Sequence, residues 1–217
     1  MKVIAVSIGQ PITLDYEGRQ VRTGIFKQPV DGRVQIGLCG LAGDGQADLE
    51  AHGGKDKAIY VYSVENYRYW EQQLQRGTLS YGQFGENLTV EGMLDESVHI
   101  GDVFSIGTSV VQVTQPRVPC YKLGIRMEAG HFPKEFMFSG KVGFYLRVLQ
   151  AGDVGAGDAI ECLGRDPVGL NVRESMLALS NQAERFEIIA KALQIDALSS
   201  AWRSDLAQRQ AGSKAAH

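Results

Sequence analysis

Short apolar runs, many alternating with polar residues and separated by glycine, occupy the chain from Met1 to about residue 164. Runs of this length are typical of β-strands, because successive side chains of a strand point to opposite faces of the sheet. The runs cover residues 3–8, 34–38, 98–100, 103–106, 109–113, 143–149 and 159–163. Many short strands at this spacing predict a mainly β fold, either a barrel or a sandwich.

One helical pattern interrupts these runs at residues 63–74. Ser63 is a suitable N-cap, because its hydroxyl can accept a hydrogen bond from a free backbone N–H of the first turn. Val64, Tyr67, Trp70 and Leu74 fall on one face of that helix. We expect this face to pack in the core.

The pattern turns helical after residue 166 and stays so to about residue 210. Asn171 can cap a helix over 172–179, Asn181 can cap one over 182–193, and Ser199 or Ser200 can open a third that ends before Gly212. The apolar stripe of the second helix is predicted to be Phe186, Ile189, Ala190 and Leu193. The sequence thus predicts a β domain over 1–165 and a small three-helix domain over 166–217.

Composition and charge narrow the function classes. The 217 residues are 44% hydrophobic and 22% charged with a net charge of −3, so a sizeable core is expected and no overall basic field recruits nucleic acid or an anionic membrane. No apolar stretch approaches the roughly 20 residues that a membrane span needs, and the N-terminal run lacks a secretory pattern. We therefore expect a cytoplasmic protein.

The most unusual segment places Cys120 after two prolines and between two cations. Pro116 and Pro119 fix φ and remove backbone donors, so the segment after the predicted strand is stiff. Arg117 and Lys122 flank the cysteine, and neighbouring cations stabilise a thiolate, which is the nucleophilic and metal-binding form. The plain alternative is a small buried hydrophobe. The setting favours a functional role for Cys120.

The other two cysteines lack this setting. Cys162 alternates with Ile160 on one predicted strand face and is interpreted as core filling, and Cys39 lies at a glycine turn without nearby cations. Three widely spaced cysteines argue against a disulfide framework and suit a reducing compartment.

Two further clusters carry polar groups suited to a ligand. Residues 40–45, Gly-Leu-Ala-Gly-Asp-Gly, precede residues 52–57, His-Gly-Gly-Lys-Asp-Lys. Glycines let backbone amides approach an anion, but the spacing matches neither a dinucleotide nor a Walker motif, so a simple turn cluster is the alternative. Asn87 offers an amide edge to a heterocycle, and Lys141 offers a charge to a phosphate.

Taken in order, these motifs resemble the MOSC domain, the C-terminal domain of molybdenum cofactor sulfurases. The resemblance runs from about residue 30 to 165, and the helical tail is similar to that of the YiiM subgroup. The motifs are Gly40-Leu41-x-Gly43-Asp44, His52-Gly53-Gly54-x-Asp56-Lys57-Ala58, Gly85-Glu86-Asn87-Leu88, Gln115-Pro116-Arg117-x-Pro119-Cys120-Tyr121-Lys122 and Gly140-Lys141-x-Gly143.

The resemblance implies a MOSC-type β-barrel that binds a molybdenum–molybdopterin cofactor and reduces N-hydroxylated compounds such as 6-N-hydroxylaminopurine. It implies that Cys120 supplies a thiolate ligand to molybdenum, which suits a soft metal site. An external flavin reductase is the implied electron donor, and a homodimer stays open as an assembly. The expected cofactor-binding residues are His52, Gly53, Gly54, Lys55, Asn87, Arg117, Lys122 and Lys141.

Three other functions compete with this prediction. Cys120 can serve as a persulfide carrier that relays sulfur. The three-helix tail can act as a helix-turn-helix DNA reader, although its six basic and six acidic residues balance and leave no basic recognition face. A cysteine hydrolase would pair Cys120 with His52 or His131 as the base.

Overall fold

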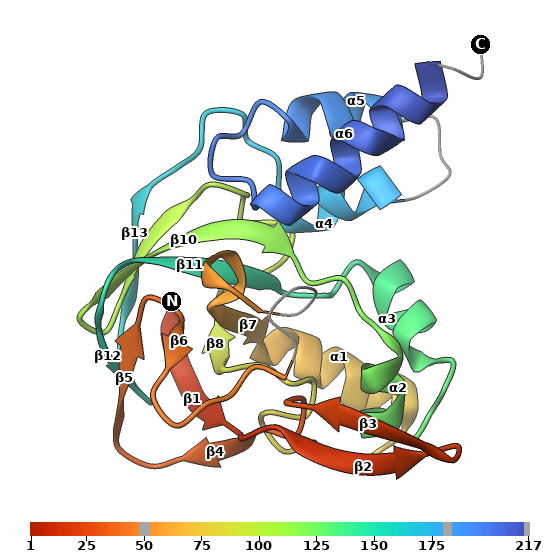
Figure 1. The fold of residues 1–217 in the computed structure, drawn as a ribbon. Helices are drawn as coiled ribbons and strands as arrows, with labels where there is room; N and C mark the ends of the chain where they lie inside the picture. The colour runs from red at the N-terminus through yellow and green to blue at the C-terminus, as the bar shows by residue number, and fades with distance from the viewer. Residues whose placement is uncertain (48–52, 180–183, 215–217) are drawn as a thin grey trace.

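The computed structural model describes residues 1–47, 53–179 and 184–214 (Figure 1). The strands are β1 (Lys2–Ile8), β2 (Ile12–Tyr16), β3 (Arg19–Thr23), β4 (Gln28–Val30), β5 (Arg33–Gly37), β6 (Gly40–Leu41), β7 (Ile59–Ser63), β8 (Leu88–Glu91), β9 (Val103–Ile106), β10 (Ser109–Pro116), β11 (Phe144–Gln150), β12 (Gly152–Gly155) and β13 (Ile160–Gly164). The helices are α1 (Val64–Leu74), α2 (Tyr121–Met127), α3 (Phe132–Ser139), α4 (Val172–Ser175), α5 (Arg185–Ala192) and α6 (Ser200–Lys214), with short 3-10 turns η1 (Lys55–Lys57) and η2 (Met176–Leu179).

Eight strands form the main sheet in the order β13-β9-β10-β11-β7-β8-β1-β4. Every pairing is antiparallel except β7 with β8, which are parallel and joined through α1. A three-stranded sheet, β12-β5-β6, and the hairpin β2–β3 complete the β structure. The predicted mainly β class is therefore confirmed.

The sheet curls without closing. Lys2 and Ala159 form an isolated antiparallel bridge, and the Val3 N–H donates to the Asp158 carbonyl at 2.9 Å, so the start of β1 meets the start of β13. Strand pairing across the described ranges nevertheless leaves β13 and β4 as edges of the sheet, so the expected barrel is not a closed one.

Helix α1 begins where the sequence predicts. The Ser63 hydroxyl accepts from the Asn66 N–H at 3.3 Å, and Val64, Tyr67 and Trp70 are buried while Leu74 is partly buried. The apolar face of α1 therefore belongs to the core, as expected.

The C-terminal helices lie together on one side of the sheet, at the top of Figure 1. Asn171 caps α4 by accepting from the Glu174 N–H at 2.7 Å, as predicted. The predicted stripe of α5 is partly wrong: Phe186 and Ala190 are exposed, and Ile188, Ile189 and Ala192 are buried instead. Helix α6 also continues through Gly212, where the sequence predicted its end; Asn181 lies outside the described residues.

Helix and sheet share one hydrophobic cluster, because Ile189, Trp202 and Leu206 belong to the same buried group as Val113 and Leu146 of the sheet. The C-terminal helices and the sheet thus pack into one continuous core. The domain boundary near residue 165 stays a prediction from the sequence. No helix in the described ranges has the length and apolar character to cross a bilayer.

Two sequence predictions are wrong in this region. Residues 98–100 form no strand; their backbone is held by a bridge from His99 to Asn171, so a long-range contact replaced the strand pairing. Cys162 is exposed, because β13 is an edge strand whose register shifts between Cys162 and Gly164.

Candidate functional site

The Cys120 segment leaves the sheet at the end of β10. The Arg117 N–H donates to the Gly143 carbonyl at 3.0 Å, which fixes the first residue beyond the strand. Cys120 then precedes α2 and is partly buried, whereas Cys39 and Cys162 are exposed. The structure therefore sets this thiol apart from the other two.

The turn that receives Arg117 is built on a buried carboxylate. Asp95 accepts from the Val142 and Gly143 N–H groups at 3.0 and 2.7 Å. Gly143 has φ +68°, and a Cβ there would lie 2.3 Å from the Val61 carbonyl oxygen, so only glycine fits. The motif around Lys141 thus has a structural role: it positions the segment that carries Arg117.

A first cavity of about 100 Å³ opens beside Cys120. Four cations and one carboxylate lie on its walls, and aromatic and glycine residues complete it, so it suits an anionic ligand with a planar part. The described lining residues are Thr23, Gly24, Ile25, Lys27, Asp44, Gly45, Gln46, Ala47, Lys57, Tyr60, Phe84, Gly85, Asn87, Arg117, Cys120, Lys122 and Tyr145.

Arg117 is the most deeply buried cation of this cavity, with 5% of its surface exposed. Its guanidinium lies 5.3 Å from the ring centres of Tyr60 and Phe136, and its buried Nη1 has no hydrogen-bond partner in the described structure. Burial opposes the charge, but nearby Tyr60, Tyr145 and Cys120 hold the pKa of Arg117 above its usual value. A buried, charged donor without an acceptor is what an anion site requires.

A second buried cation, Lys27, was not found from the sequence. It forms a close ion pair with Asp44, and the two side chains are only 8% and 7% exposed. Burial lowers the pKa of Lys27, while Asp44 counteracts the shift. The Gly9 N–H also donates to Asp44 at 2.9 Å. Only the Gly43-Asp44 motif hinted at this pair, because Lys27 itself lies in no motif.

Asn87 lines the cavity, but its side-chain amide forms hydrogen bonds with other residues of the protein. Its Oδ1 accepts from the Tyr60 N–H at 3.1 Å, and its Nδ2 donates to Asp44 at 2.9 Å and to the Ser7 carbonyl at 3.4 Å. Both N–H groups are therefore engaged, and Asn87 holds the wall together more than it presents donors to a ligand.

The glycine–lysine cluster contributes a different lysine from the expected one. Lys57 lines the cavity, whereas Lys55 is exposed and Gly53 and Gly54 are not among the lining residues. The Gly54 N–H donates to Gln46 at 3.0 Å, within the fold. His52 lies outside the described residues. Lys57 takes the place that the sequence analysis gave to Lys55.

Two other expected residues do not come together with Cys120. Lys141 lies 5.1 Å from the ring centre of Tyr69 and does not line the cavity. The His131 side chain is 73% exposed and lies 3.7 Å from Glu135, away from the cavity walls. The geometry therefore gives His131 no role as a base for Cys120.

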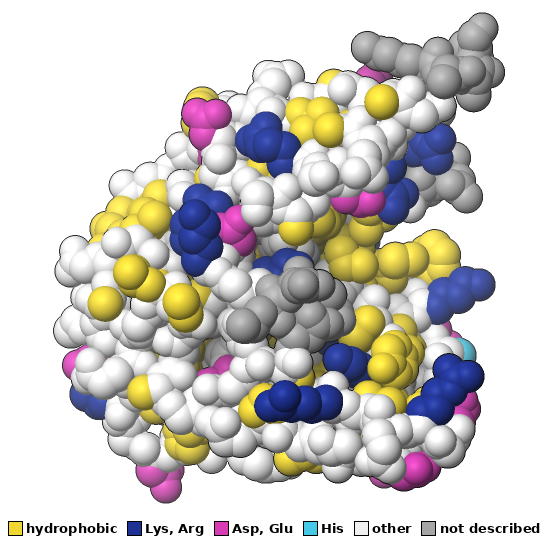
Figure 2. Space-filling view, in the orientation of Figure 1, with side chains coloured by type: hydrophobic (Ala, Val, Ile, Leu, Met, Phe, Trp, Pro, Cys, Tyr) yellow, Lys and Arg dark blue, Asp and Glu magenta, His cyan; other side chains and the backbone are white. Residues whose placement is uncertain are grey.

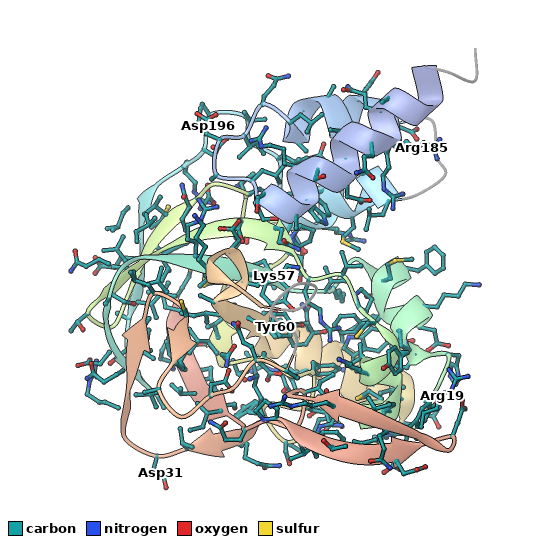
Figure 3. The ribbon with its side chains drawn as sticks, in the orientation of Figure 1. Arg19, Asp31, Lys57, Tyr60, Arg185 and Asp196 are labelled. Carbon is teal, nitrogen blue, oxygen red and sulfur yellow. The ribbon has the colours of Figure 1, made fainter. Side chains whose placement is uncertain are left out.

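A second cavity, of about 310 Å³, lies between the Cys120 segment and α6. Cys120, Lys57 and Tyr145 line both cavities, so the thiol stands where they adjoin. Figure 2 shows this face hollowed below the C-terminal helices, with Lys, Arg and hydrophobic side chains on its walls. In Figure 3 Lys57 and Tyr60 lie near the middle of the molecule, between these helices and the hairpin β2–β3.

The position of α6 depends on Asp56 of η1. This carboxylate accepts from the Ser200 N–H at 3.1 Å and from Arg147 Nε at 2.9 Å. Ser199 caps α6 by accepting from the Trp202 N–H at 3.1 Å, and its hydroxyl donates to Gln115 at 2.6 Å. The C-terminal helix is thus attached to the elements on either side of Lys57 and Cys120.

The structure thus combines a mainly β fold with one partly buried thiol that lines a cavity with four cations on its walls. The chain belongs to the MOSC domain family, which matches residues 48–161.

Its relatives agree with this assignment. The chain is 41% identical over 208 residues to the uncharacterized protein YflK of Bacillus subtilis, covering 96% of this chain and 94% of YflK. It is 37% identical over 145 residues to YiiM of Escherichia coli, covering 66% and 65%, and 35% identical over 151 residues to a protein of Gibberella moniliformis named Reductase, covering 68% of this chain but 27% of that longer protein. The solved structure of YiiM from Geobacillus stearothermophilus superposes with a TM-score of 0.81 at 32% identity, covering 96% of this chain and 98% of that one.

Proposed function

We propose that this protein is a reductase of N-hydroxylated compounds, such as 6-N-hydroxylaminopurine, that depends on a molybdenum–molybdopterin cofactor ligated by Cys120. Family membership and the relative named Reductase support an oxidoreductase. The observation that carries the proposal is the placement of Cys120, which lines both the cation-rich cavity and the cavity beneath α6. A cofactor held by this sulfur in the first cavity would therefore be open to a substrate that enters from the second.

The residues of the first cavity fit this cofactor. The cofactor carries a phosphate and a flat pterin, and the walls of the cavity bring cations and aromatic rings together. Arg117 offers an unsatisfied buried donor, and Lys57 and Lys122 add charge on the same walls. A cysteine thiolate is a suitable soft ligand for a metal that already has sulfur ligands.

When bound, the cofactor supplies the two electrons that, with two protons, convert the N–OH group into an amine and water. The chain's own groups bind and orient. Arg117 and Lys57 hold the anionic end, and the rings of Tyr60 and Phe84 wall off solvent. Burial raises the pKa of Tyr145, so its hydroxyl stays protonated and can donate a hydrogen bond to the departing oxygen at the junction of the cavities.

The electrons come from outside the chain under this proposal. We infer a cytoplasmic location and a flavin reductase, supplied by a nicotinamide cofactor, as the donor; such a contact is expected to be small and transient. Reconstitution with a purified flavin reductase tests this: turnover must depend on the added donor.

The decisive experiment measures molybdenum content and reduction of 6-N-hydroxylaminopurine in the same preparation. Wild-type protein from a molybdenum-replete host should hold molybdenum and reduce the base. Cys120→Ala should lower the reduction rate by at least about a hundredfold, because a metal ligand is lost. Cys39→Ala and Cys162→Ala are matched controls, since both thiols are exposed and neither lines a cavity.

A persulfide carrier is the outcome that would replace this proposal. Protein that holds no molybdenum after reconstitution, but carries sulfur on Cys120 that cyanide releases, would be a sulfur relay. A Cys120→Ala variant with full reductase activity would remove the assigned ligand altogether.

A further inference from the structure

The cavity beneath α6 has an asymmetric wall. Val118 and Pro119 line it from the Cys120 segment, and Trp202, Asp205 and Arg209 line it from α6. Residues spaced by three and four positions share one helix face, so these three α6 side chains form a single stripe along the cavity.

This stripe of α6 is apolar and buried at one end and charged and half-exposed at the other. Trp202 lies in the first turn of α6, is 5% exposed and belongs to the core, which makes the inner end apolar and rigid. Asp205 and Arg209 lie further along, with side chains 45% and 47% exposed. A flat apolar body can therefore lie against the inner end while a polar edge meets the outer turn.

Asp205 retains acceptor capacity for a ligand. Its Oδ2 accepts from Arg209 Nε at 2.9 Å, and no contact between described residues engages its Oδ1. A carboxylate accepts hydrogen bonds and donates none, so it selects ligands that carry N–H groups.

We propose that the cavity between Cys120 and α6 is the substrate chamber, and that Asp205 selects planar N-hydroxylated heterocycles whose ring N–H donates to its free oxygen. The proposal rests on the reductase function proposed above and adds its specificity-determining residue. Trp202 supplies the apolar floor, and Arg209 holds the carboxylate in place.

Kinetics test the role of Asp205 with two substrates: 6-N-hydroxylaminopurine, which has a ring N–H, and N-phenylhydroxylamine, which has none. Asp205→Ala should raise the KM for the purine about tenfold, the usual effect of losing one hydrogen bond to a charged group, and change that for the phenyl compound by less than about twofold. Values of kcat and molybdenum content should stay unchanged. Asp205→Asn keeps an acceptor and should fall between wild type and Asp205→Ala.

Two control variants separate selection from structural damage. Asp196→Ala makes the same change in the same helical region at an exposed residue that does not line the chamber, and it should leave both KM values unchanged (Figure 3). Arg209→Gln loosens the carboxylate but keeps it, so it should raise the KM for the purine less than Asp205→Ala does. Equal KM changes for both substrates, or an Arg209→Gln variant that matches Asp205→Ala, would overturn the role of Asp205.

Tryptophan fluorescence tests the chamber without turnover. The purine should quench cofactor-free wild-type protein saturably through Trp202. Trp202→Phe should abolish that quenching, because Trp70, the other tryptophan, does not line the chamber and packs against Phe132 and Phe136. Saturable quenching, in a protein that neither takes up molybdenum nor gains reductase activity on reconstitution with the cofactor, would support the chamber and reject the proposed reductase. Full reductase activity without quenching, and with Asp205→Ala indifferent to substrate, would reject the chamber and keep the reductase.

Discussion

The two cavities that adjoin at Cys120 differ in how deeply their charged side chains are buried. The first contains a buried ion pair, Lys27–Asp44, and a buried guanidinium, Arg117. The second contains the half-exposed pair Asp205–Arg209. Buried charges are costly and need fixed partners, whereas exposed pairs contribute little and tolerate change. We infer that the first cavity is preorganised for one ligand and that the second can be varied without loss of the fold.

The largest expected effect is on stability, from Asp44→Asn. This change leaves Lys27 buried without its counter-charge and should lower the free energy of unfolding by about 3–5 kcal/mol. Asp153→Asn is the matched control, because it breaks an exposed pair with Arg33 and should cost less than about 1 kcal/mol. Urea unfolding measures both. If both variants lose the same free energy of unfolding, burial of the Lys27–Asp44 pair does not make it more important for stability than an exposed pair.

Next in size is a loss of cofactor without loss of stability, from Arg117→Met. Removing this buried charge should weaken cofactor binding about a hundredfold, while the cofactor-free protein keeps or gains thermal stability. The measurements are molybdenum retained per chain after reconstitution and the melting temperature of the cofactor-free form. Arg126→Met is the control: Arg126 also has a buried nitrogen, Nε, without a partner, but it does not line the cavity. A comparable loss of molybdenum from Arg126→Met would contradict a specific role for Arg117.

A smaller effect concerns the attachment of α6 and depends on pH. Burial raises the pKa of Asp56, but hydrogen bonds from Ser200 and Arg147 outweigh it and bring the pKa below its ordinary value of 3.8. The stabilisation is therefore fully present above 3.8 and is lost as the pH falls through the lower folded value. Asp56→Asn should cost about 1–2 kcal/mol at neutral pH and flatten the acid limb of the stability curve. An unchanged acid limb in urea titrations would contradict this linkage.

The smallest expected effects are on molybdenum retention, and they should show which of Lys55, Lys57 and Lys141 contributes to cofactor binding. Lys55→Gln and Lys141→Gln should change molybdenum retention by less than about twofold, since neither lines the first cavity, whereas Lys57→Gln should weaken it about tenfold, as expected for one charged hydrogen bond. Metal analysis of the three variants, prepared in parallel, gives the comparison. If Lys141→Gln loses more molybdenum than Lys57→Gln does, Lys141 contributes to cofactor binding after all.

Local signals were predicted well from the sequence. The caps Ser63 and Asn171 were found because a capping side chain bonds a backbone N–H only three residues away. The predicted runs match β1, β5, β9, β10, β11 and β13, because alternation is a property of neighbouring residues. The strands that were not predicted are β2, β3, β4, β6, β7, β8 and β12. Helices α2 and α3 were not predicted, because both are short segments whose helical form depends on packing.

The site was predicted only where its residues lie in one segment. Cys120, Arg117 and Lys122 share such a segment and do line one cavity. Lys27 and Asp44 are 17 residues apart, and Asp56 and Ser200 are 144 apart, so no local pattern reveals that they meet. Lys141 carried the right charge, yet its side chain lies against Tyr69, which only tertiary structure decides.

The contact between Asp56 and Ser200 has a consequence for biosynthesis. Contacts between residues so distant in the chain form late, because the entropy of closing a long loop is lost before any compensating interaction is made. During translation the sheet and its cation-lined cavity can assemble while α6 is still in the ribosome. The wall that holds Asp205 is added last, so under the proposed function a nascent chain would gain its capacity to bind the cofactor before it gains its choice of substrate.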